Sequence, residues 1–219
     1  MSIRERIAFL GQMRRNFEQT GAIQPSSRHL AEAMAAPLRR FRAADTTTAT
    51  RILEIGPGTG AVTRSIAACM GPHDELDCYE INEEFVRYLG DAIRHDDTLA
   101  PRADQIRIHH AAAQDLTATD RFDFAICSAP LNNFDAATID AVLEPMLRAL
   151  TAHGTATLFE YVFFPAFRRT ISPPAPQRRL RAAHAAKSKW LARYGRDASL
   201  VLRNVPPARV HELGPLIRR

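Results

Sequence analysis

The sequence predicts an α/β fold in which a mostly parallel, seven-stranded sheet carries helices on both faces. Two observations predict it. From residue 51 onward, five predicted strands alternate with helical patterns, and a glycine-rich loop follows the first strand. Strands separated by helices imply βαβ crossovers, which build parallel sheets. The chain has 219 residues, of which 46% are hydrophobic and 24% charged, and this suits one soluble domain.

The expected elements follow in chain order. Parallel strands are predicted at residues 51–55, 76–80, 106–110, 122–127 and 155–159. Helices are predicted at residues 61–70, 83–94 and 136–150. Prolines at 173–176 interrupt the pattern, and a basic helix is expected at 177–194. Residues 199–204 and 209–213 then predict a closing antiparallel hairpin.

The first 42 residues are expected to form a helical lid or membrane-binding segment, ahead of a cofactor-binding domain at residues 43–219. Residues 2–18 place apolar side chains at helical spacing, which predicts one apolar face bordered by arginines. Such a helix suits either an interfacial anchor or packing against the domain. A second helix is expected from about residue 27 to 41, capped by Ser26 or Ser27 and kinked or ended by Pro37. Residues 43–50 predict a polar linker.

A cofactor loop is predicted where the first strand turns into a helix. Glu54 precedes Gly56, Gly58 and Gly60 in the spacing E-x-G-x-G-x-G, whereas a dinucleotide-binding loop has G-x-G-x-x-G. Glu80 ends the next strand about 20 residues later, where a carboxylate accepts both ribose hydroxyls. The spacing resembles motif I of class I methyltransferases. The resemblance implies a Rossmann-like methyltransferase fold and S-adenosylmethionine as the cofactor, with S-adenosylhomocysteine as its product.

The rest of the cofactor site is expected at the ends of the neighbouring strands. Ile81 follows Glu80, and motif IV corresponds to residues 127–133, where Ser128 and Pro130 should lie close to the transferred methyl group. Methyltransferases usually end the third strand with an acidic residue that receives the adenine amino group. This chain has Ala112 there. The adenine could instead be bound by the backbone of Ala112 and Ala113, or by the side chain of Gln114 or Asp115.

Five further segments together resemble bacterial phosphatidylethanolamine N-methyltransferases, over residues 9–210. They are FL at 9–10, GAIQPSS at 21–27, YEIN at 79–82, APLNNF at 129–134 and RNVPPARV at 203–210. The resemblance implies methylation of the phosphatidylethanolamine amine, with Ser26 and Ser27 near the cofactor. The nearest rival family is the ribosomal RNA adenine dimethyltransferases, whose motif IV is Asn-Leu-Pro-Tyr-like. Here Ser128 and Leu131 occupy its first and last positions, and leucine offers no aromatic face for a flipped base.

Methyl transfer to an amine requires the neutral form of the amine, so the site needs groups that hold the amine or remove its proton. Tyr161, just after the fifth strand, is the first candidate and Ser128 the second. Glu160, His109 and His110 are weaker candidates.

The region from residue 161 to 196 has no acidic residue but many basic ones. It predicts contacts with lipid phosphate or an anionic membrane. The expected substrate- or membrane-binding residues are Arg168, Arg169, Arg178, Arg179, Arg181 and Trp190.

Three functions remain open on the sequence: a phospholipid N-methyltransferase, an RNA base methyltransferase, and a catalytically silent protein that only binds lipid. A net charge of +5 favours an anionic partner under each. Cys69, Cys78 and Cys127 have no metal-ligand spacing, so they are expected to be reduced core residues and no metal is expected. The predicted location is the cytoplasm, peripherally at the inner face of the cell membrane.

Overall fold

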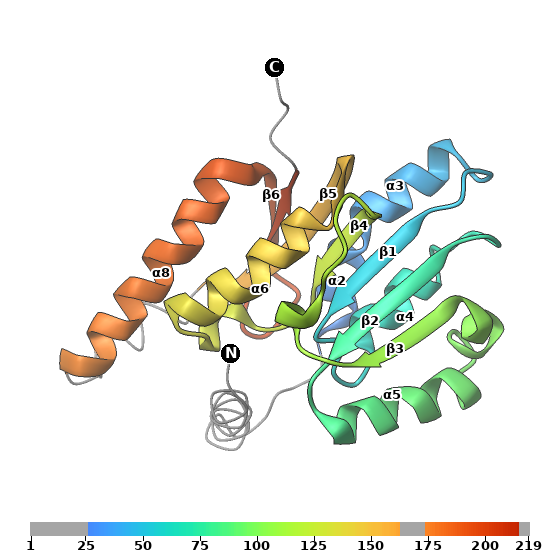
Figure 1. The fold of residues 1–219 in the computed structure, drawn as a ribbon, viewed down its shortest axis with the longest axis horizontal. Helices are drawn as coiled ribbons and strands as arrows, with labels where there is room; N and C mark the ends of the chain where they lie inside the picture. The colour runs from blue at the N-terminus through green and yellow to red at the C-terminus, as the bar shows by residue number, and fades with distance from the viewer. Residues whose placement is uncertain (1–25, 163–173, 215–219) are drawn as a thin grey trace.

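A computed structural model describes residues 26–162 and 174–214. Its sheet has seven strands in the order β3-β2-β1-β4-β5-β7-β6, with helices on both faces (Figure 1). The predicted α/β class is therefore confirmed. The strands are β1 (Arg51–Ile55), β2 (Glu75–Glu80), β3 (Ile106–His110), β4 (Phe122–Cys127), β5 (Leu150–Tyr161), β6 (Gly195–Val201) and β7 (Ala208–Leu213). The α-helices are α2 (Arg28–Met34), α3 (Ala36–Ala44), α4 (Ala61–Ala67), α5 (Glu83–His95), α6 (Ala136–Arg148) and α8 (Pro174–Tyr194).

The first five strands are parallel, so their carboxyl ends meet along one side of the sheet, here named the carboxyl edge. Three short 3-10 helices connect elements: η1 (Ala100–Gln105), η2 (Ala113–Asp115) and η3 (Leu131–Asn133). Strand β7 runs antiparallel between β5 and β6, which confirms the predicted closing hairpin. Ligands of open α/β sheets bind at the carboxyl edge, so the fold points to the loops after β1, β2 and β4.

Several predicted boundaries differ from the observed ones. The helix expected at 27–41 is two helices, because α2 ends before Ala35 and Pro37 stands in the first turn of α3, where its missing N–H costs nothing. Helix α3 also takes in Ala43 and Ala44, which were expected in the linker. The hairpin strand β6 begins at Gly195 and ends at Val201, earlier than predicted. The predicted helix at residues 2–18 lies outside the described residues.

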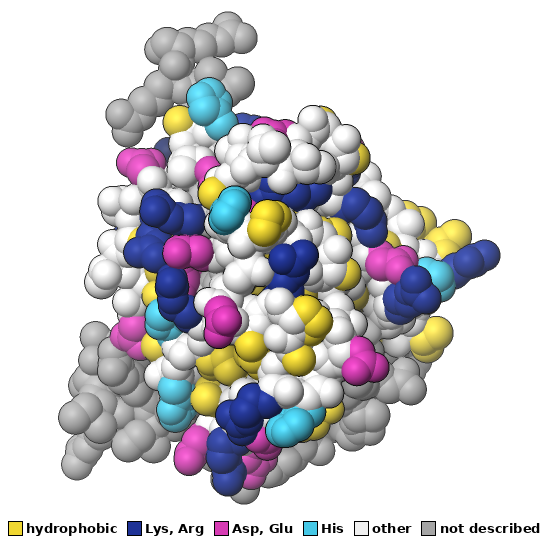
Figure 2. All heavy atoms as spheres, turned by 90° about the vertical axis from the view of Figure 1, so that its right-hand side faces the viewer, with side chains coloured by type: hydrophobic (Ala, Val, Ile, Leu, Met, Phe, Trp, Pro, Cys, Tyr) yellow, Lys and Arg dark blue, Asp and Glu magenta, His cyan; other side chains and the backbone are white. Residues whose placement is uncertain are grey.

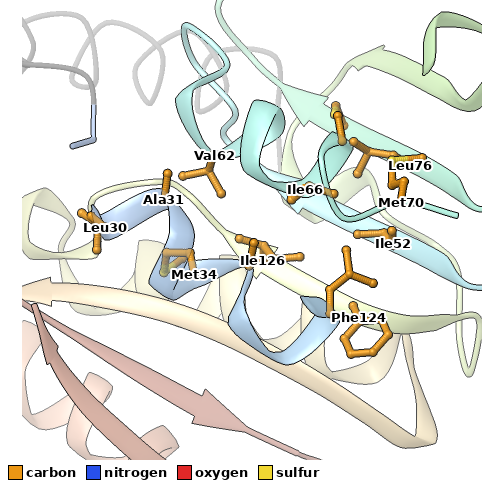
Figure 3. Close-up of a cluster of buried hydrophobic side chains, with 14 of the residues drawn as sticks. Leu30, Ala31, Met34, Ile52, Val62, Ile66, Met70, Leu76, Phe124 and Ile126 are labelled. Carbon is orange, nitrogen blue, oxygen red and sulfur yellow. The ribbon is translucent and has the colours of Figure 1, made fainter. Parts of the chain in front are cut away.

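The first core lies between the sheet and the helices α2, α3, α4 and α5 (Figure 3). Leu30 and Met34 of α2 are fully buried there and share the core with Ile52 and Ile126 of the sheet. Thr157 of β5 also donates a hydrogen bond to the Met34 carbonyl at 2.9 Å. The domain boundary predicted between residues 42 and 43 stays a prediction, but the described core continues across it.

The second core lies on the opposite face, under α6 and α8. It contains Leu53 and Leu158 of the sheet and Leu143 of α6. Cys78 and Cys127 are buried free thiols in β2 and β4, while Cys69 is half-buried in the turn after α4. None of the helices in the described ranges combines the length and hydrophobicity needed to cross a bilayer.

Candidate functional site

The loop between β1 and α4 has an unusual backbone that only glycine adopts readily. Gly56, Gly58 and Gly60 have φ angles of +70°, +56° and +81°. A Cβ atom on Gly56 would come within 2.9 Å of the Ala129 Cβ, so β1 and the loop after β4 approach closely there. A Cβ on Gly58 would meet nothing within 4 Å, so the loop borders open space at that position.

Glu80, at the end of β2, lies directly against this loop. The Gly58 N–H donates to Glu80 Oε2 at 3.1 Å, and the Asn82 N–H donates to Oε1 at 2.9 Å. Burial raises the pKa of Glu80, while these backbone hydrogen bonds oppose the rise. The structure thus brings the two predicted halves of the cofactor site together. A buried carboxylate beside the open space at Gly58 fits the ribose end of a nucleoside cofactor.

The loop after β3 contains an acid close to the position where the sequence lacks one. The Ala112 N–H donates to Asp115 Oδ2 at 3.1 Å, so the carboxylate of Asp115 folds back to the end of β3. A ring nitrogen of His110 lies 3.2 Å from the Ile81 carbonyl oxygen, which ties the loops after β2 and β3 together. Ala113 is buried in the second core. Of the groups left open by the sequence, Asp115 is the one whose carboxylate reaches Ala112.

Glu54 forms the centre of a buried polar cluster beneath the loop. Ser128 donates to Glu54 Oε1 and Thr63 donates to Oε2, both at 2.7 Å. The Cys78 thiol lies 3.8 Å from Oε2. Burial raises the pKa of Glu54 to about 7, although these hydrogen bonds lower it and the nearby Glu80 charge adds to the rise. Glu54 is fully buried, whereas Ser128 is half-buried at the carboxyl edge.

Motif IV continues from Ser128 into η3, and Pro130 precedes that short helix. The side-chain amide of Asn132 donates to the Tyr161 carbonyl at 3.2 Å, which connects η3 to the end of β5. The Tyr161 ring is half-buried and packs edge-to-face on Phe159, with centroids 5.3 Å apart. Burial raises the pKa of the Tyr161 phenol, so it is a poor proton acceptor at neutral pH.

The weaker acid–base candidates have structural partners. Glu160 accepts hydrogen bonds from Lys187 and, at 3.0 Å, from His211. Burial opposes its ionisation, but these partners outweigh burial and lower the pKa of Glu160 to about 2, so it is a weak base. His109 lies 2.8 Å from Asp77 on β2 and stacks on Tyr79. The paired histidines lie on β3, which two strands separate from β4 and Ser128, and their expected acid–base role stays a prediction.

The predicted phosphate- and membrane-binding residues fall into three groups. Arg168 and Arg169 lie outside the described residues, as does the side chain of Arg179. Arg178 and Arg181 are exposed on α8, which has no acidic residue. Trp190 is half-buried, its indole N–H donates to Asp140 Oδ1 of α6 at 2.6 Å, and its ring stacks on Tyr194. The indole thus packs α8 onto α6, and the expected role of Trp190 at a membrane stays a prediction.

A different face of the molecule shows how unusual α8 is. Figure 2 looks at the right-hand side of Figure 1, where basic and acidic side chains lie intermixed. Helix α8 instead exposes Arg178, Arg181, Lys189 and Arg193 with no acidic side chain between them. Helix α8 therefore presents an exposed basic face without acidic side chains, which suits an anionic partner.

The start of α2 meets the turn between β6 and β7. The Ser27 hydroxyl accepts from the Leu30 N–H at 3.2 Å and caps α2, as predicted. The Ser27 N–H donates to Asn204 Oδ1 at 3.1 Å, and Asn204 also donates to the Pro206 carbonyl at 2.7 Å. Ser26, beside it, is half-buried. Two segments that were singled out in the sequence, GAIQPSS and RNVPPARV, thus touch each other.

Three residues of the site region were missed. Lys187 is buried, contacts Glu160 and lies 3.4 Å from Asn132 Oδ1. The sequence does contain a signal for the burial of Lys187. The lysine lies on the same helix face as three residues at helical spacing, Ala183, Trp190 and Tyr194, and this face is apolar. Thr63 and Arg64 of α4 had no comparable signal.

Arg64 supports the cofactor loop from the side of α4. It donates to the Thr59 carbonyl at 2.9 Å and to Asp96 Oδ2 at 2.7 Å. These contacts depend on the tertiary fold, because Asp96 lies 32 residues away.

Comparison with known proteins agrees with this geometry. Residues 52–154 match a family described as "Methyltransferase domain". A curated relative, a tRNA1(Val) (adenine(37)-N6)-methyltransferase of Dyadobacter fermentans, is 28% identical over 130 residues, which are 59% of this chain. The chain spans about half the length of that relative.

Two solved structures illustrate the likeness in fold. A putative O-methyltransferase from Klebsiella pneumoniae has a TM-score of 0.65 and 15% identity, covering 93% of this chain and 88% of its own. The O-methyltransferase TomG from Streptomyces achromogenes, solved in complex with SAM, has a TM-score of 0.57 and 16% identity over 86% of this chain and 79% of its own. These likenesses confirm the predicted Rossmann-like methyltransferase fold.

Proposed function

We propose that this chain is a class I S-adenosylmethionine-dependent methyltransferase that methylates the amine of phosphatidylethanolamine, toward phosphatidylcholine, at a membrane surface. The observation that carries the proposal is the hydrogen bond from Ser128 to the buried carboxylate of Glu54. It provides a path by which a proton leaves an acceptor at the carboxyl edge. An ammonium group must lose a proton before its nitrogen can attack the methyl carbon.

The proton path follows from the orientation of the serine. The Ser128 hydroxyl hydrogen points at Glu54 Oε1, so the lone pairs of its oxygen are left to accept an amine N–H. Ser128 then receives the amine proton while its own proton passes to Glu54, whose pKa of about 7 suits this exchange at neutral pH. S-adenosylmethionine, when bound, supplies the electrophilic methyl group. The new N–C bond forms as the S–C bond breaks.

A lipid amine is favoured over a nucleobase by the residue at the aromatic position of motif IV. Leu131 is buried in the second core, so neither its chemistry nor its placement provides a stacking surface. The nearby Tyr161 ring already packs on Phe159. The contact between Ser27 and Asn204 also supports the lipid reading, since both segments resemble those of phosphatidylethanolamine N-methyltransferases.

Attachment to the membrane belongs to the same proposal. The exposed basic face of α8 would meet anionic head groups, and residues 2–18 would act as an interfacial helix at the inner face of the cell membrane. The head-group phosphate would contact Arg178 or Arg181, or the Arg168–Arg169 pair. Deletion of residues 1–18 should abolish co-sedimentation with anionic liposomes, and unchanged co-sedimentation would refute the anchor.

A second candidate function is RNA adenine N6-methylation. The curated relative acts on tRNA1(Val) by its name, and the exposed arginines of α8 suit a phosphate backbone as well as a membrane. Adenine N6 is also an exocyclic amine, so the Ser128–Glu54 pair suits both acceptors. The absence of an aromatic residue at position 131 counts against this candidate.

Radiolabelled cofactor distinguishes the candidates. The full chain is incubated with liposomes containing phosphatidylethanolamine and phosphatidylglycerol, or with total transfer and ribosomal RNA. We expect label in lipid and none in RNA, and label in RNA alone would sink the lipid proposal. Cofactor binding without label in any acceptor would favour a catalytically silent lipid-binding protein.

A further inference from the structure

The end of β6 and the turn that follows it expose an unusual set of aliphatic side chains. Leu200, Leu202 and Val205 are 52%, 68% and 82% exposed, respectively. Tyr88, on α5, is the one other large hydrophobic residue of the described ranges with comparable exposure. Single exposed apolar residues are common, but a cluster of them marks an interaction site. We name residues 200–205 the apolar turn.

The fold holds the apolar turn in place while leaving these side chains in solvent. Val201 alternates with Leu200 and Leu202 and packs into the first core. Asn204 is buried and fastens the turn to α2 through the Ser27 N–H. The exposed side chains therefore project from a fixed support.

The apolar turn lies beside the carboxyl edge. The Val162 N–H, just after β5, donates to the Pro207 carbonyl at 2.9 Å, and Tyr161 pairs with Ala208. The same edge holds Ser128 and the glycine loop. A surface that docks onto the apolar turn would consequently lie next to the candidate site.

Charge favours an anionic lipid surface as the occupant. Arg203 and Arg209 are exposed, and no acidic residue occurs from position 198 to 211. Aliphatic side chains flanked by arginines suit insertion at the boundary between head groups and acyl chains. Single-stranded RNA would instead be expected to stack on aromatic residues, which residues 198–210 lack.

We propose that the apolar turn inserts into bilayers that contain anionic phospholipid and thereby positions the methyl-transfer site at the lipid surface. The identity of the substrate in this inference rests on the proposed function. The insertion itself is a separate property, because it depends on residues 200–205 and not on Ser128 or the cofactor loop.

Vesicle binding by the full chain tests the insertion. The vesicles contain phosphatidylcholine and phosphatidylglycerol but no phosphatidylethanolamine, so no turnover occurs. We expect the double variant L202S/V205S to partition at least about tenfold more weakly than wild type, because two aliphatic side chains lose their burial. Tyr88→Ser is the control, because it removes an exposed hydrophobic side chain from a different element. It should bind the vesicles as wild type does. Equal partitioning of the double variant, or no binding by wild type, would overturn the proposal.

Methylation assays separate this inference from the proposed function. On dissolved dihexanoyl-phosphatidylethanolamine the double variant should retain the wild-type rate, while on vesicles its rate should fall. If wild type methylates no phosphatidylethanolamine but the double variant still loses vesicle binding, the proposed function fails and the insertion stands. A wild-type dimer, or an RNA complex, that the substitutions disrupt without any change in vesicle binding would overturn the insertion.

Discussion

Gly56 and Gly58 both have positive φ angles, but their surroundings differ. A substitution at Gly56 should therefore affect mainly stability, and one at Gly58 mainly cofactor binding. In Gly56→Ala the new Cβ would meet the Ala129 Cβ at 2.9 Å, so the loops after β1 and β4 must move apart. In Gly58→Ala the Cβ projects into open space, and the backbone strain is about 1–2 kcal/mol. Gly56→Ala should therefore lower the melting temperature more than Gly58→Ala.

Gly58→Ala should mainly weaken cofactor binding, because its Cβ enters the space expected to hold the ribose. We expect S-adenosylhomocysteine to bind at least about tenfold more weakly by isothermal titration calorimetry, a loss of about 1.4 kcal/mol. Gly90→Ala on α5, where an added Cβ would meet only Ile108 at 3.9 Å, serves as the control. Wild-type affinity in Gly58→Ala would contradict the expected position of the cofactor.

Ser128 and Glu54 predict a specific pH dependence of the rate. The ionised form of Glu54 is the proton acceptor, and its pKa is about 7, so the rate at saturating substrate should rise as pH increases through 7. Ser128→Ala should lower kcat by about a hundredfold or more while leaving cofactor affinity near wild type. A Ser128→Ala enzyme with an unchanged kcat would exclude the proton path. A flat wild-type profile between pH 6 and 8 would exclude Glu54 as the acceptor.

At the scale of elements, a buried ion pair joins α8 to the sheet. Lys187 of α8 contacts Glu160 of β5, and both side chains are largely buried. His211 of β7 contributes a second partner to the same carboxylate. The pair also touches η3 through Asn132, so α8, β5, β7 and motif IV converge on Glu160. Lys187 therefore helps to hold the basic helix on the sheet, together with the packing of Trp190 on α6.

Lys187→Met should loosen α8 specifically. The change leaves Glu160 buried with one fewer cation, and breaking a buried pair costs about 3–5 kcal/mol. Hydrogen exchange should accelerate in α8 more than in β1 or β2. Lys189→Met, on the exposed face of the same helix, is the matched control and should leave exchange unchanged. Equal protection of α8 in both variants would show that the pair does not hold the helix.

Glu160 also predicts how stability changes with acid. Its pKa is about 2 in the folded chain and near 4.5 when unfolded, so its stabilising contribution is complete above about pH 4.5 and is lost as pH falls toward 2. Urea unfolding between pH 5 and 3 should show a decline in the free energy of unfolding. This decline should be smaller in Glu160→Gln, and an identical decline would assign it to other carboxylates.

Local patterns predicted the elements well where one physical signal dominated. Strands β1, β3 and β4 have the predicted bounds, because each combines β-branched or aromatic residues with flanking turn or polar residues. Pro37 can either kink a helix or end it, and packing decides between the two. The separation of α2 and α3 at Ala35 could therefore not be predicted from the sequence alone. The contact of Trp190 with Asp140 could not be predicted from a local pattern, because the two residues lie 50 positions apart. The pairing of Ser128 with Glu54 spans 74 residues, so only the fold reveals it.

At the scale of the whole molecule, chemistry and docking surfaces gather at one edge. The glycine loop, Glu80 and Ser128 lie at the carboxyl ends of β1, β2 and β4. The apolar turn lies beside the end of β5. The opposite side, seen in Figure 2, has intermixed charge. The chain has an ordinary composition and a net charge of +5. Because its charged and exposed apolar side chains are unevenly distributed, one surface still suits an anionic lipid layer.

Cofactor binding should stabilise the entire chain through Glu80. A ligand at 100 times its Kd adds about 2.7 kcal/mol to the free energy of unfolding, which corresponds to roughly 5–10 °C in melting temperature for a domain of this size. Saturating S-adenosylhomocysteine should produce this shift in wild type.

Glu80→Gln replaces a carboxylate oxygen, which accepts hydrogen bonds, with a donor, so the shift at the same concentration should largely disappear. Its unliganded melting temperature should fall, because the amide nitrogen cannot accept one of the two backbone N–H hydrogen bonds, so the shift is measured against the unliganded variant itself. Glu84→Gln, exposed on α5, should keep the full shift. An undiminished shift in Glu80→Gln would mean that the ribose is bound elsewhere along the carboxyl edge.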